Sequence, residues 1–204
     1  MATRKYAQRR RAEQQKQTRD RIVQATMELH EELGPARTTI SAIAERAGVE
    51  RLTVYRHFPD ETELFKACSG RFLELQPPPD AARWSDSESP EERTRKALAA
   101  FYHYYRQTAG MWHSVYRDIE LVPANADVVR EFEDWIGGIR DDLVKTYRPA
   151  NAAKRRALRG ILGHALRFST WESLDREGFS DTAKAASILG WLDAARDGRP
   201  GRAS

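Results

Sequence analysis

Residues 38–58 read TTISAIAERAGVERLTVYRHF, and this stretch decides how the rest of the chain is interpreted. Apolar residues recur at helical spacing over 40–47, which predicts a short helix with one buried face. Gly48 suits the left-handed conformation that ends a helix and turns the chain. The apolar residues of 49–58 give a second helix a buried face of its own, so the spacing predicts a helix-turn-helix.

The second helix of this motif also carries side chains that no core explains. They are Arg51, Leu52, Thr53, Tyr55, Arg56 and His57. Such side chains can donate hydrogen bonds to bases, pair with phosphates or press against a thymine methyl group. Arg51 and Leu52 lie in the first turn, the part of a recognition helix that goes deepest into the major groove, so we expect them to read bases. For Tyr55, a ring packed on the domain core is a competing interpretation.

The run AIAERAGVERLTVYRHFPDETELF, residues 42–65, resembles the DNA-binding signature of the tetracycline-repressor (TetR) family. The A-G-V and T-V-Y-R-H-F elements carry the resemblance, which extends over residues 18–68. It implies phosphate contacts for Thr39, Thr53, Tyr55 and His57. Two departures concern Glu50, where the family commonly has a serine or threonine cap, and Asp60-Glu61, where many members carry a lysine that grips the DNA backbone.

The first 21 residues form a basic arm. They hold eight lysines and arginines, among them Arg9, Arg10 and Arg11, against Glu13 and Asp20, a net charge of +6 on a chain whose total is +4. A basic arm on a near-neutral body indicates a polyanion partner. Beside a helix-turn-helix, we expect residues 1–17 to be disordered and to contact the minor groove or the phosphate backbone. The alternative is a solvated tail that only aids solubility.

The length of 204 residues is enough to bury a stable core without disulfides. We expect an all-α fold of about nine helices, with a DNA-binding domain at 18–65, a helical effector-binding and dimerisation domain at 66–198, and a flexible tail at 199–204. The single cysteine, Cys68, excludes an intrachain disulfide and is interpreted as a small buried hydrophobe. No apolar run is long enough to cross a membrane, and we expect a cytoplasmic, nucleoid-associated protein.

Five further helices are predicted beyond the proline-rich loop that follows Gln76, the last of them over 180–197. A helix begins with the capping box at residues 89–92 and ends at Gly110, and a shorter one follows over 111–119. Longer helices are predicted around 128–143 and from Asn151 to about Asp175. In the supporting helix that precedes Gly34-Pro35, His30 is either a core histidine with a partner or a surface residue.

The last two long helices, 151–175 and 180–197, are apolar on more than one side. A helix with two apolar faces has two packing partners, which predicts a homodimer through these helices. A dimer also suits a helix-turn-helix, because two copies read half-sites about 34–36 Å apart. The alternative is a monomeric bundle with a wide core.

The predicted body carries many aromatic residues, most of which core packing alone would explain. The resemblance implies an effector cavity in this region, for which an apolar or aromatic small molecule is the expected ligand. The candidate effector-binding residues are Tyr102, Tyr105, Trp112, Tyr116, Phe132, Trp135, His164, Phe168 and Trp171.

These features together predict a ligand-responsive transcriptional regulator, a repressor released from a palindromic operator on double-stranded DNA by its effector. A sequence-nonspecific architectural nucleic-acid binder is the alternative. A helical-bundle metalloenzyme is remote, because no histidine has the glutamate three residues before it that di-metal bundles use. No phosphate-binding glycine loop, Ser-His-Asp order or Cys-x-x-Cys pair occurs either. We therefore expect no catalytic residues, metal or cofactor.

Overall fold

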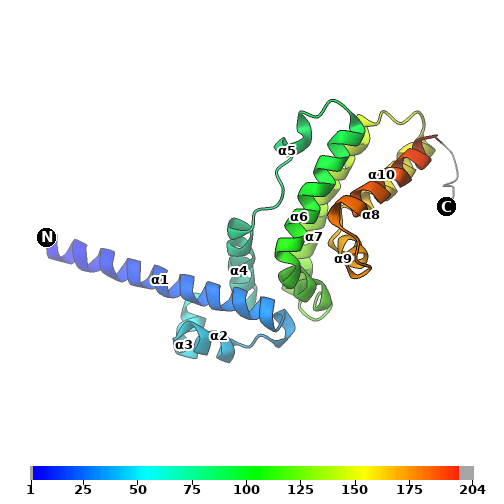
Figure 1. Cartoon of the computed structure of the whole chain (residues 1–204). Helices are drawn as coiled ribbons and strands as arrows, with labels where there is room; N and C mark the ends of the chain where they lie inside the picture. The colour runs from blue at the N-terminus through cyan, green and yellow to red at the C-terminus, as the bar shows by residue number, and fades with distance from the viewer. Residues whose placement is uncertain (1, 198–204) are drawn as a thin grey trace. The chain divides into compact units, whose positions relative to one another are not determined.

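A computed structural model describes residues 2–197, which form ten α-helices, one 3-10 turn and no strand (Figure 1). The all-α prediction is confirmed. The elements are α1 (Ala2–Glu32), η1 (Pro35–Arg37), α2 (Ile40–Ala47), α3 (Arg51–His57), α4 (Glu61–Leu75), α5 (Ala82–Ser85), α6 (Pro90–Arg117), α7 (Pro123–Thr146), α8 (Ala152–Ala165), α9 (Phe168–Arg176) and α10 (Asp181–Asp197). Among these described residues, no helix is long and apolar enough to cross a membrane.

The chain divides into two compact units. Unit 1 comprises Met1–Pro77 and Gly110–Val129, and unit 2 comprises Pro78–Ala109 and Arg130–Ser204. Helices α6 and α7 therefore contribute residues to both. The boundary predicted between residues 65 and 66 falls inside α4, which continues without a break to Leu75.

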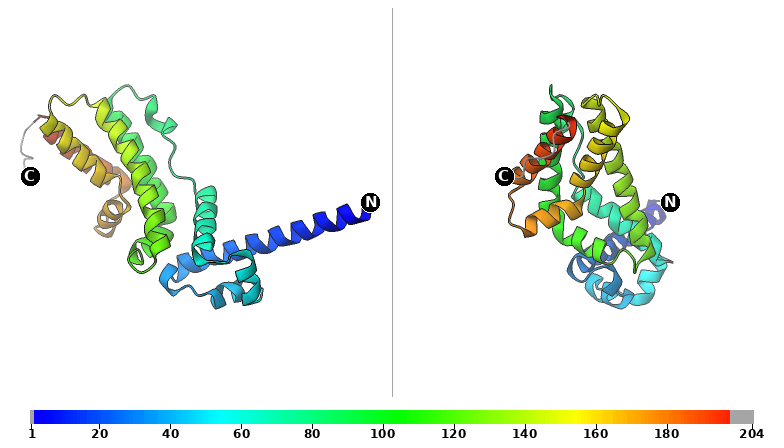
Figure 2. Two further views of the ribbon diagram at one scale, coloured as in Figure 1. Left: turned by 180° about the vertical axis from the view of Figure 1, so that it is seen from behind. Right: turned by 90° about the vertical axis from the view of Figure 1, so that its right-hand side faces the viewer.

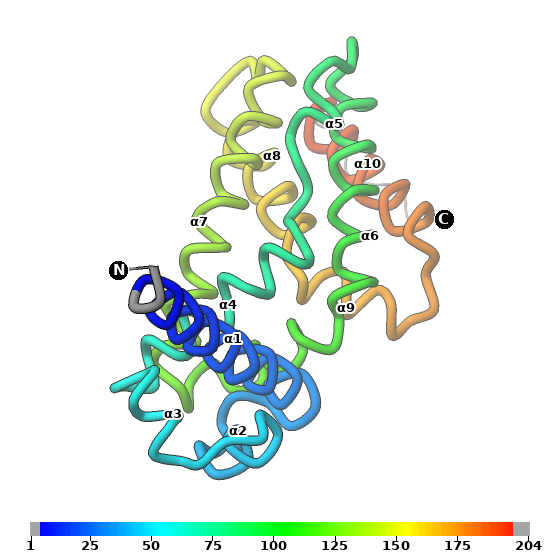
Figure 3. Tube along the Cα trace, turned by 90° about the vertical axis from the view of Figure 1, so that its left-hand side faces the viewer, coloured from blue at the N-terminus to red at the C-terminus, as the bar shows by residue number. Residues whose placement is uncertain are grey.

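Unit 1 is built on α1, which packs against α2 and α4, while α2 packs against α3 (Figures 2 and 3). Its core is a cluster of buried apolar side chains from these four helices and the turn after α3. They are Ile22, Val23, Ala25, Leu29, Ile43, Ala44, Ala47, Val54, Phe58 and Leu64. Ile43, Ala44, Ala47, Val54 and Phe58, which the spacing over 40–58 placed on inner faces, are in this core, while Ile40 and Val49 pack against it partly buried.

The basic arm differs from the disordered segment that the sequence predicted. Residues 2–17 are not disordered but form the first half of α1. The reason lies in their composition, because residues 2–21 contain no glycine or proline and are rich in alanine, arginine, glutamine and lysine, all good helix formers. The tail predicted at 199–204 lies outside the described residues.

The loop after α1 is tied to the end of α6 within unit 1. The Arg117 guanidinium donates to the Leu33 carbonyl at 2.8 Å, and the Asp118 carboxylate accepts from the Ala36 backbone N–H at 3.0 Å. Gly34, at a φ of 91°, lies so close to these side chains that an added β-carbon would overlap them. The Arg117 hydrogen bond, more than any other contact, lowers the pKa of Asp118. The carboxylate therefore stays charged and holds the loop.

His30 and Cys68 settle two sequence questions. His30 is buried, lies 5.3 Å from Phe65 between ring centroids, and has its Nδ1 3.7 Å from the Cys68 sulfur. It is therefore a core histidine with a partner. Burial raises the pKa of the Cys68 thiol to about 12, which confirms that this residue behaves as a small hydrophobe.

Two of the predicted helices beyond the proline-rich loop differ from those observed. One helix, α6, runs through Gly110 where two were expected. Conversely, the helix expected over 151–175 is broken, since α8 ends at Ala165 and α9 begins at Phe168. Tyr102 donates its hydroxyl to the Ala165 carbonyl at 3.1 Å, and Tyr105 donates to the Leu166 carbonyl at 2.7 Å. These hydroxyls satisfy carbonyls that a helix end leaves open, so the break is stabilised from α6.

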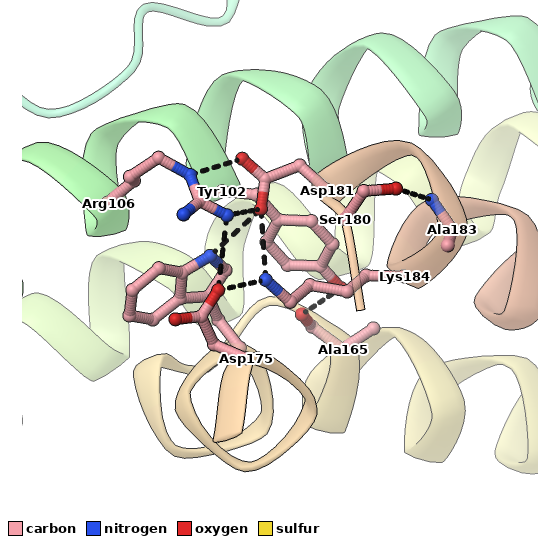
Figure 4. Close-up of polar contacts among 9 residues, drawn as sticks. Tyr102, Arg106, Ala165, Asp175, Ser180, Asp181, Ala183 and Lys184 are labelled. Atoms are coloured by element: carbon pink, nitrogen blue, oxygen red, sulfur yellow. Dashed lines mark hydrogen bonds and ion pairs between the residues drawn. The ribbon is translucent and has the colours of Figure 1, made fainter. Parts of the chain in front are cut away.

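A cluster of charges joins α6, α9 and α10 inside unit 2 (Figure 4). Lys184 is fully buried, and its ammonium donates to Asp175 at 2.6 Å and to Asp181 at 3.0 Å. Arg106 binds the same two carboxylates. Two cations and two anions thus balance, which is the condition under which a buried lysine is tolerated.

Candidate nucleic-acid interface

Local sequence sets the geometry of the α2–α3 motif. The Thr39 hydroxyl accepts from the Ala42 backbone N–H at 3.2 Å and caps α2. Gly48 ends the helix in the left-handed conformation, with φ 64° and ψ 44°. After two further residues α3 begins at Arg51, so α2 and α3 are joined by the short turn that a helix-turn-helix requires.

The short helix α3 has one buried and one open side. Val54 and Phe58 are buried in the unit 1 core. On the other side, Leu52 is 67% exposed and Tyr55 is 43% exposed. An apolar leucine at that exposure, carried on a helix whose inner face is already filled, has nothing in unit 1 to pack against.

The remaining predicted contact residues of α3 are arranged around this open side. Arg51 and Arg56 are exposed, while Thr53 and His57 are half-buried. Within residues 2–197 neither arginine takes part in an ion pair. By contrast, Arg46 on α2 is held by Glu32 at 2.8 Å. The two arginines of α3 are therefore available to an outside anion.

Charges near α3 also bear on His57. Burial first, and then the positive charges of Arg56 and Arg19, lower the pKa of His57. The imidazole is therefore neutral at pH 7, and would act as a single hydrogen-bond donor rather than as a cation. Glu50 precedes the helix without a capping hydrogen bond from its side chain.

In the arm, the residues from Lys5 to Gln17 are all exposed along α1. Arg9, Arg10 and Arg11 are consecutive on a helix, so their side chains leave it at successive steps of about 100°. They do not share one face. A single groove or strand would face only part of this set at a time.

Comparison with known proteins identifies the region that contains this motif. Residues 22–68 match the family model for "Bacterial regulatory proteins, tetR family". Over this region the chain is similar to the tetR family. Over 80 residues it is 39% identical to the HTH-type transcriptional regulator TtgR of Pseudomonas putida, covering 39% of this chain and 37% of that protein. The chain therefore spans less than two fifths of the length of the curated relatives it matches.

Solved structures extend the likeness of fold beyond the matched region. A TetR-like transcriptional regulator from Rhodococcus sp. RHA1 has a TM-score of 0.62 at 20% identity, covering 89% of this chain and 96% of that chain. NalD, the secondary repressor of the MexAB-OprM multidrug efflux pump in Pseudomonas aeruginosa, has a TM-score of 0.58 at 19% identity, with the same coverage of both chains. At these identities the likeness concerns the fold alone.

The nine candidate effector residues fall into two groups. Trp112 and Tyr116 belong to unit 1, where their ring centroids lie 5.9 Å apart. The other seven belong to unit 2. The structure therefore does not gather all nine candidates within one compact unit.

Within unit 2, several aromatic candidates have packing roles. Tyr102, Tyr105, Phe168 and Trp171 are buried, and both tyrosine hydroxyls donate to backbone carbonyls. Trp135 is 38% exposed and contacts the ring of Phe132 at 5.4 Å between centroids. Among this set, Trp135 is the ring that combines aromatic neighbours with an open side.

His164, the remaining effector candidate, is exposed and lines a groove between α7 and α8. Sequence reasoning missed the arginines that gather around that groove, because they come from helices that are far apart in the chain. Within residues 2–197 no group of three or more histidine, cysteine or carboxylate side chains is placed to hold a metal ion.

Proposed function

We propose that this chain is a DNA-binding transcriptional regulator of the repressor class, released from its operator by a small apolar or aromatic effector. The observation that carries the proposal is α3, with Arg51, Leu52, Tyr55 and Arg56 open to solvent inside the segment that matches the tetR family. An exposed helix of this kind, held by a second helix across a short turn, fits the major groove. The protein would then act in the cytoplasm, at the nucleoid.

The roles of the individual residues follow from their positions on the motif. Arg51 and Leu52 in the first turn of α3 are proposed to contact base edges, a guanine for the arginine and a thymine methyl group for the leucine. Thr39, Thr53, Tyr55 and His57 are proposed to contact phosphates, with Arg56 as a further cation beside them. Arg9, Arg10 and Arg11 extend the contact along α1, with those facing DNA adding to the salt-dependent part of the affinity.

The proposed active form is a homodimer through α8 and α10, the last two long helices. These helices pack against each other in unit 2. On α10, Trp191 is 47% exposed, and Gly190 beside it has open space where a β-carbon would lie. A large apolar ring next to a glycine suits close packing against a helix of a second copy.

For the effector, the aromatic residues of unit 2 support a ligand with an apolar or aromatic body. Trp135 is the aromatic candidate of unit 2 with an open side, and His164 is the candidate polar contact. A coupling of about 1–3 kcal/mol between effector and operator would lower the DNA affinity about 5–150-fold.

The proposal is tested by selecting bound fragments from random or genomic DNA with the purified full chain. We expect a palindromic site preferred at least about 10³-fold over random DNA. In Arg51→Ala the preference should relax at one base pair of each half-site, whereas Arg95→Ala, an exposed arginine on α6, should change nothing. Equal binding to all sequences would instead support the architectural nucleic-acid binder.

Removal of residues 2–17 separates the contribution of the arm from that of α3. We expect lower affinity and a flatter dependence on salt, with the same preferred site, because phosphate contacts position the protein without reading sequence. A change in the preferred site would mean that the arm itself reads bases.

A further inference from the structure

The groove between α7 and α8, wholly within unit 2, has a surplus of positive charge. Its volume is about 450 Å³. Arg140 of α7, Arg156 and Arg159 of α8, and Arg167 at the start of α9 line it, while Glu133 is the carboxylate among its lining residues. Basic side chains therefore come from three consecutive helices to one cavity.

The ion pairs around the groove leave this surplus uncompensated. The Asp141 carboxylate accepts from Arg140 Nε at 2.8 Å and lies 3.2 Å from Arg159 Nη1. Arg167 Nη2 lies 3.6 Å from the Glu133 carboxylate. Arg156 takes part in no ion pair within residues 2–197. Four guanidinium groups thus share two carboxylates, which leaves two positive charges.

The spacing on α8 places these groups on one side of the helix. Arg156, Arg159, Gly160 and Gly163 lie at positions i, i+3, i+4 and i+7. At Gly163 an added β-carbon would approach the Arg140 side chain to 3.1 Å, so this glycine gives that arginine room to cross α8. At Gly160 nothing lies within 4 Å of such an atom. The floor of the groove is therefore open at Gly160, and no close contact within unit 2 requires a glycine at this position.

We infer that this groove binds a small organic molecule with two negative charges, such as a phosphate monoester or a dicarboxylate. Planar guanidinium groups bind both kinds of anion through paired hydrogen bonds, and two charges match the local surplus. The volume is within the range of ligand pockets and leaves space for an organic body beside the acidic groups. Ile136, buried at the edge of the groove, offers that body an apolar contact.

A second copy of the chain is the competing occupant, because α8 is also part of the proposed dimer. A twofold interface buries the same patch on both copies. The surplus positive charge of both grooves would then be brought into one interface, where the two surpluses repel each other. This charge favours a dianion over a second copy in the groove.

The test is calorimetric titration of the full chain with four probes at about 0.15 M salt, where exposed charges are screened beyond about 8 Å. Phenyl phosphate and phthalate are the dianions, benzoate is the monoanion and benzyl alcohol is the neutral analogue. We expect both dianions to bind, benzoate to bind at least about tenfold more weakly through loss of one charge-assisted pair, and benzyl alcohol not to bind.

Variants locate the binding. The double variant Arg156→Ala/Arg159→Ala should weaken phthalate binding at least about tenfold. Arg155→Ala is the matched control, since Arg155 is exposed on the same helix but does not line the groove. Gly160→Leu should block phthalate while all four arginines remain. Circular dichroism melts verify that each variant is folded.

Three outcomes would overturn the inference. Equal weakening by Arg155→Ala and by the double variant would show diffuse attraction to a basic surface. No binding of either dianion by the folded wild-type chain would exclude the ligand class. If the double variant changes the sedimentation of the chain and no dianion binds, the groove is an interface between copies.

Discussion

Asp181→Asn is the substitution that most directly tests the charge cluster of unit 2. The Asp181 carboxylate accepts from Arg106 Nη2 at 2.7 Å, from Lys184 Nζ at 3.0 Å and from Trp171 Nε1 at 3.2 Å (Figure 4). Asparagine has the same shape but carries no charge and presents an N–H group in place of one accepting oxygen. The buried Lys184 then has only Asp175 as an anionic partner.

The expected magnitude follows from the pKa of Asp181. The hydrogen bond from Arg106, followed by those from Lys184 and Trp171, lowers this pKa from 3.8 to about 2. The side chain is 27% exposed, so screening by solvent is limited. A difference of nearly two pKa units corresponds to about 2 kcal/mol of unfolding free energy. Because the native pKa is the lower one, this stability is fully present above pH 5 and is lost as pH falls towards 2.

Urea unfolding at a series of pH values measures this contribution. At pH 7 we expect Asp181→Asn to lower the unfolding free energy by about 2 kcal/mol, and near pH 2 the difference from wild type should be much smaller. Asp142→Asn is the control, because the Asp142–Lys145 pair is 76% exposed on both sides and should contribute less than about 0.5 kcal/mol. The reasoning fails if the two variants lose equal stability at pH 7, or if the loss in Asp181→Asn does not depend on pH.

Three further predictions concern unit 1. Gly48→Ala should cost about 1–2 kcal/mol in thermal unfolding, because its φ is 64° although the nearest atom to an added β-carbon is 3.8 Å away. Gly70→Ala, in open space inside α4, should instead stabilise the chain by up to about 1 kcal/mol. Burial lowers the pKa of His30 to about 4, so the unfolding free energy should fall as pH drops from 6.5 towards 4. Urea midpoints measured over this range should fall less steeply with pH in His30→Gln than in the wild type. Cys68, with its thiol pKa raised to about 12, should resist iodoacetamide at pH 8 until urea unfolds the chain, as measured by mass spectrometry.

The helix-turn-helix could be predicted from the sequence because the interactions that begin and end its helices are local. The Thr39 hydroxyl caps α2 by accepting from the Ala42 N–H three residues away, and Gly48 turns the chain three residues before α3 begins at Arg51. The side chains left over on α3 then had to be exposed, and Leu52 and Tyr55 are. Their contacts with DNA are a prediction that the fold of this chain alone does not test.

The effector residues were harder to predict, because the sequence alone does not distinguish an aromatic side chain packed in a core from one that lines a pocket. Tyr102 and Tyr105 illustrate this, since their hydroxyls bond carbonyls more than 60 residues away at the break between α8 and α9. The charge cluster around Lys184 could likewise not be predicted from the sequence. Its members come from three helices, and only the folded chain brings the Asp175 and Asp181 carboxylates to the Lys184 ammonium.

The basic arm shows how charge and helix propensity compete. A run of like charges favours a solvated chain, and an isolated helix of this length is marginal in water because its first turn is costly to form. In α1 that turn already exists, since Ile22, Val23, Ala25 and Leu29 are packed in the unit 1 core. Each arm residue then adds to an existing helix.

A helical arm has a geometric consequence that a disordered one would not have. Because α1 is continuous from the arm to the packed residues Ile22 to Leu29, the direction of every arm side chain is fixed relative to the core of unit 1. Arg9, Arg10 and Arg11 therefore cannot all turn towards the same phosphates, as they could on a flexible tail. The register of α1 would determine which of these arginines face DNA. Inserting one residue between the arm and Ile22 would rotate that register by about 100° and exchange which arginines make the contact.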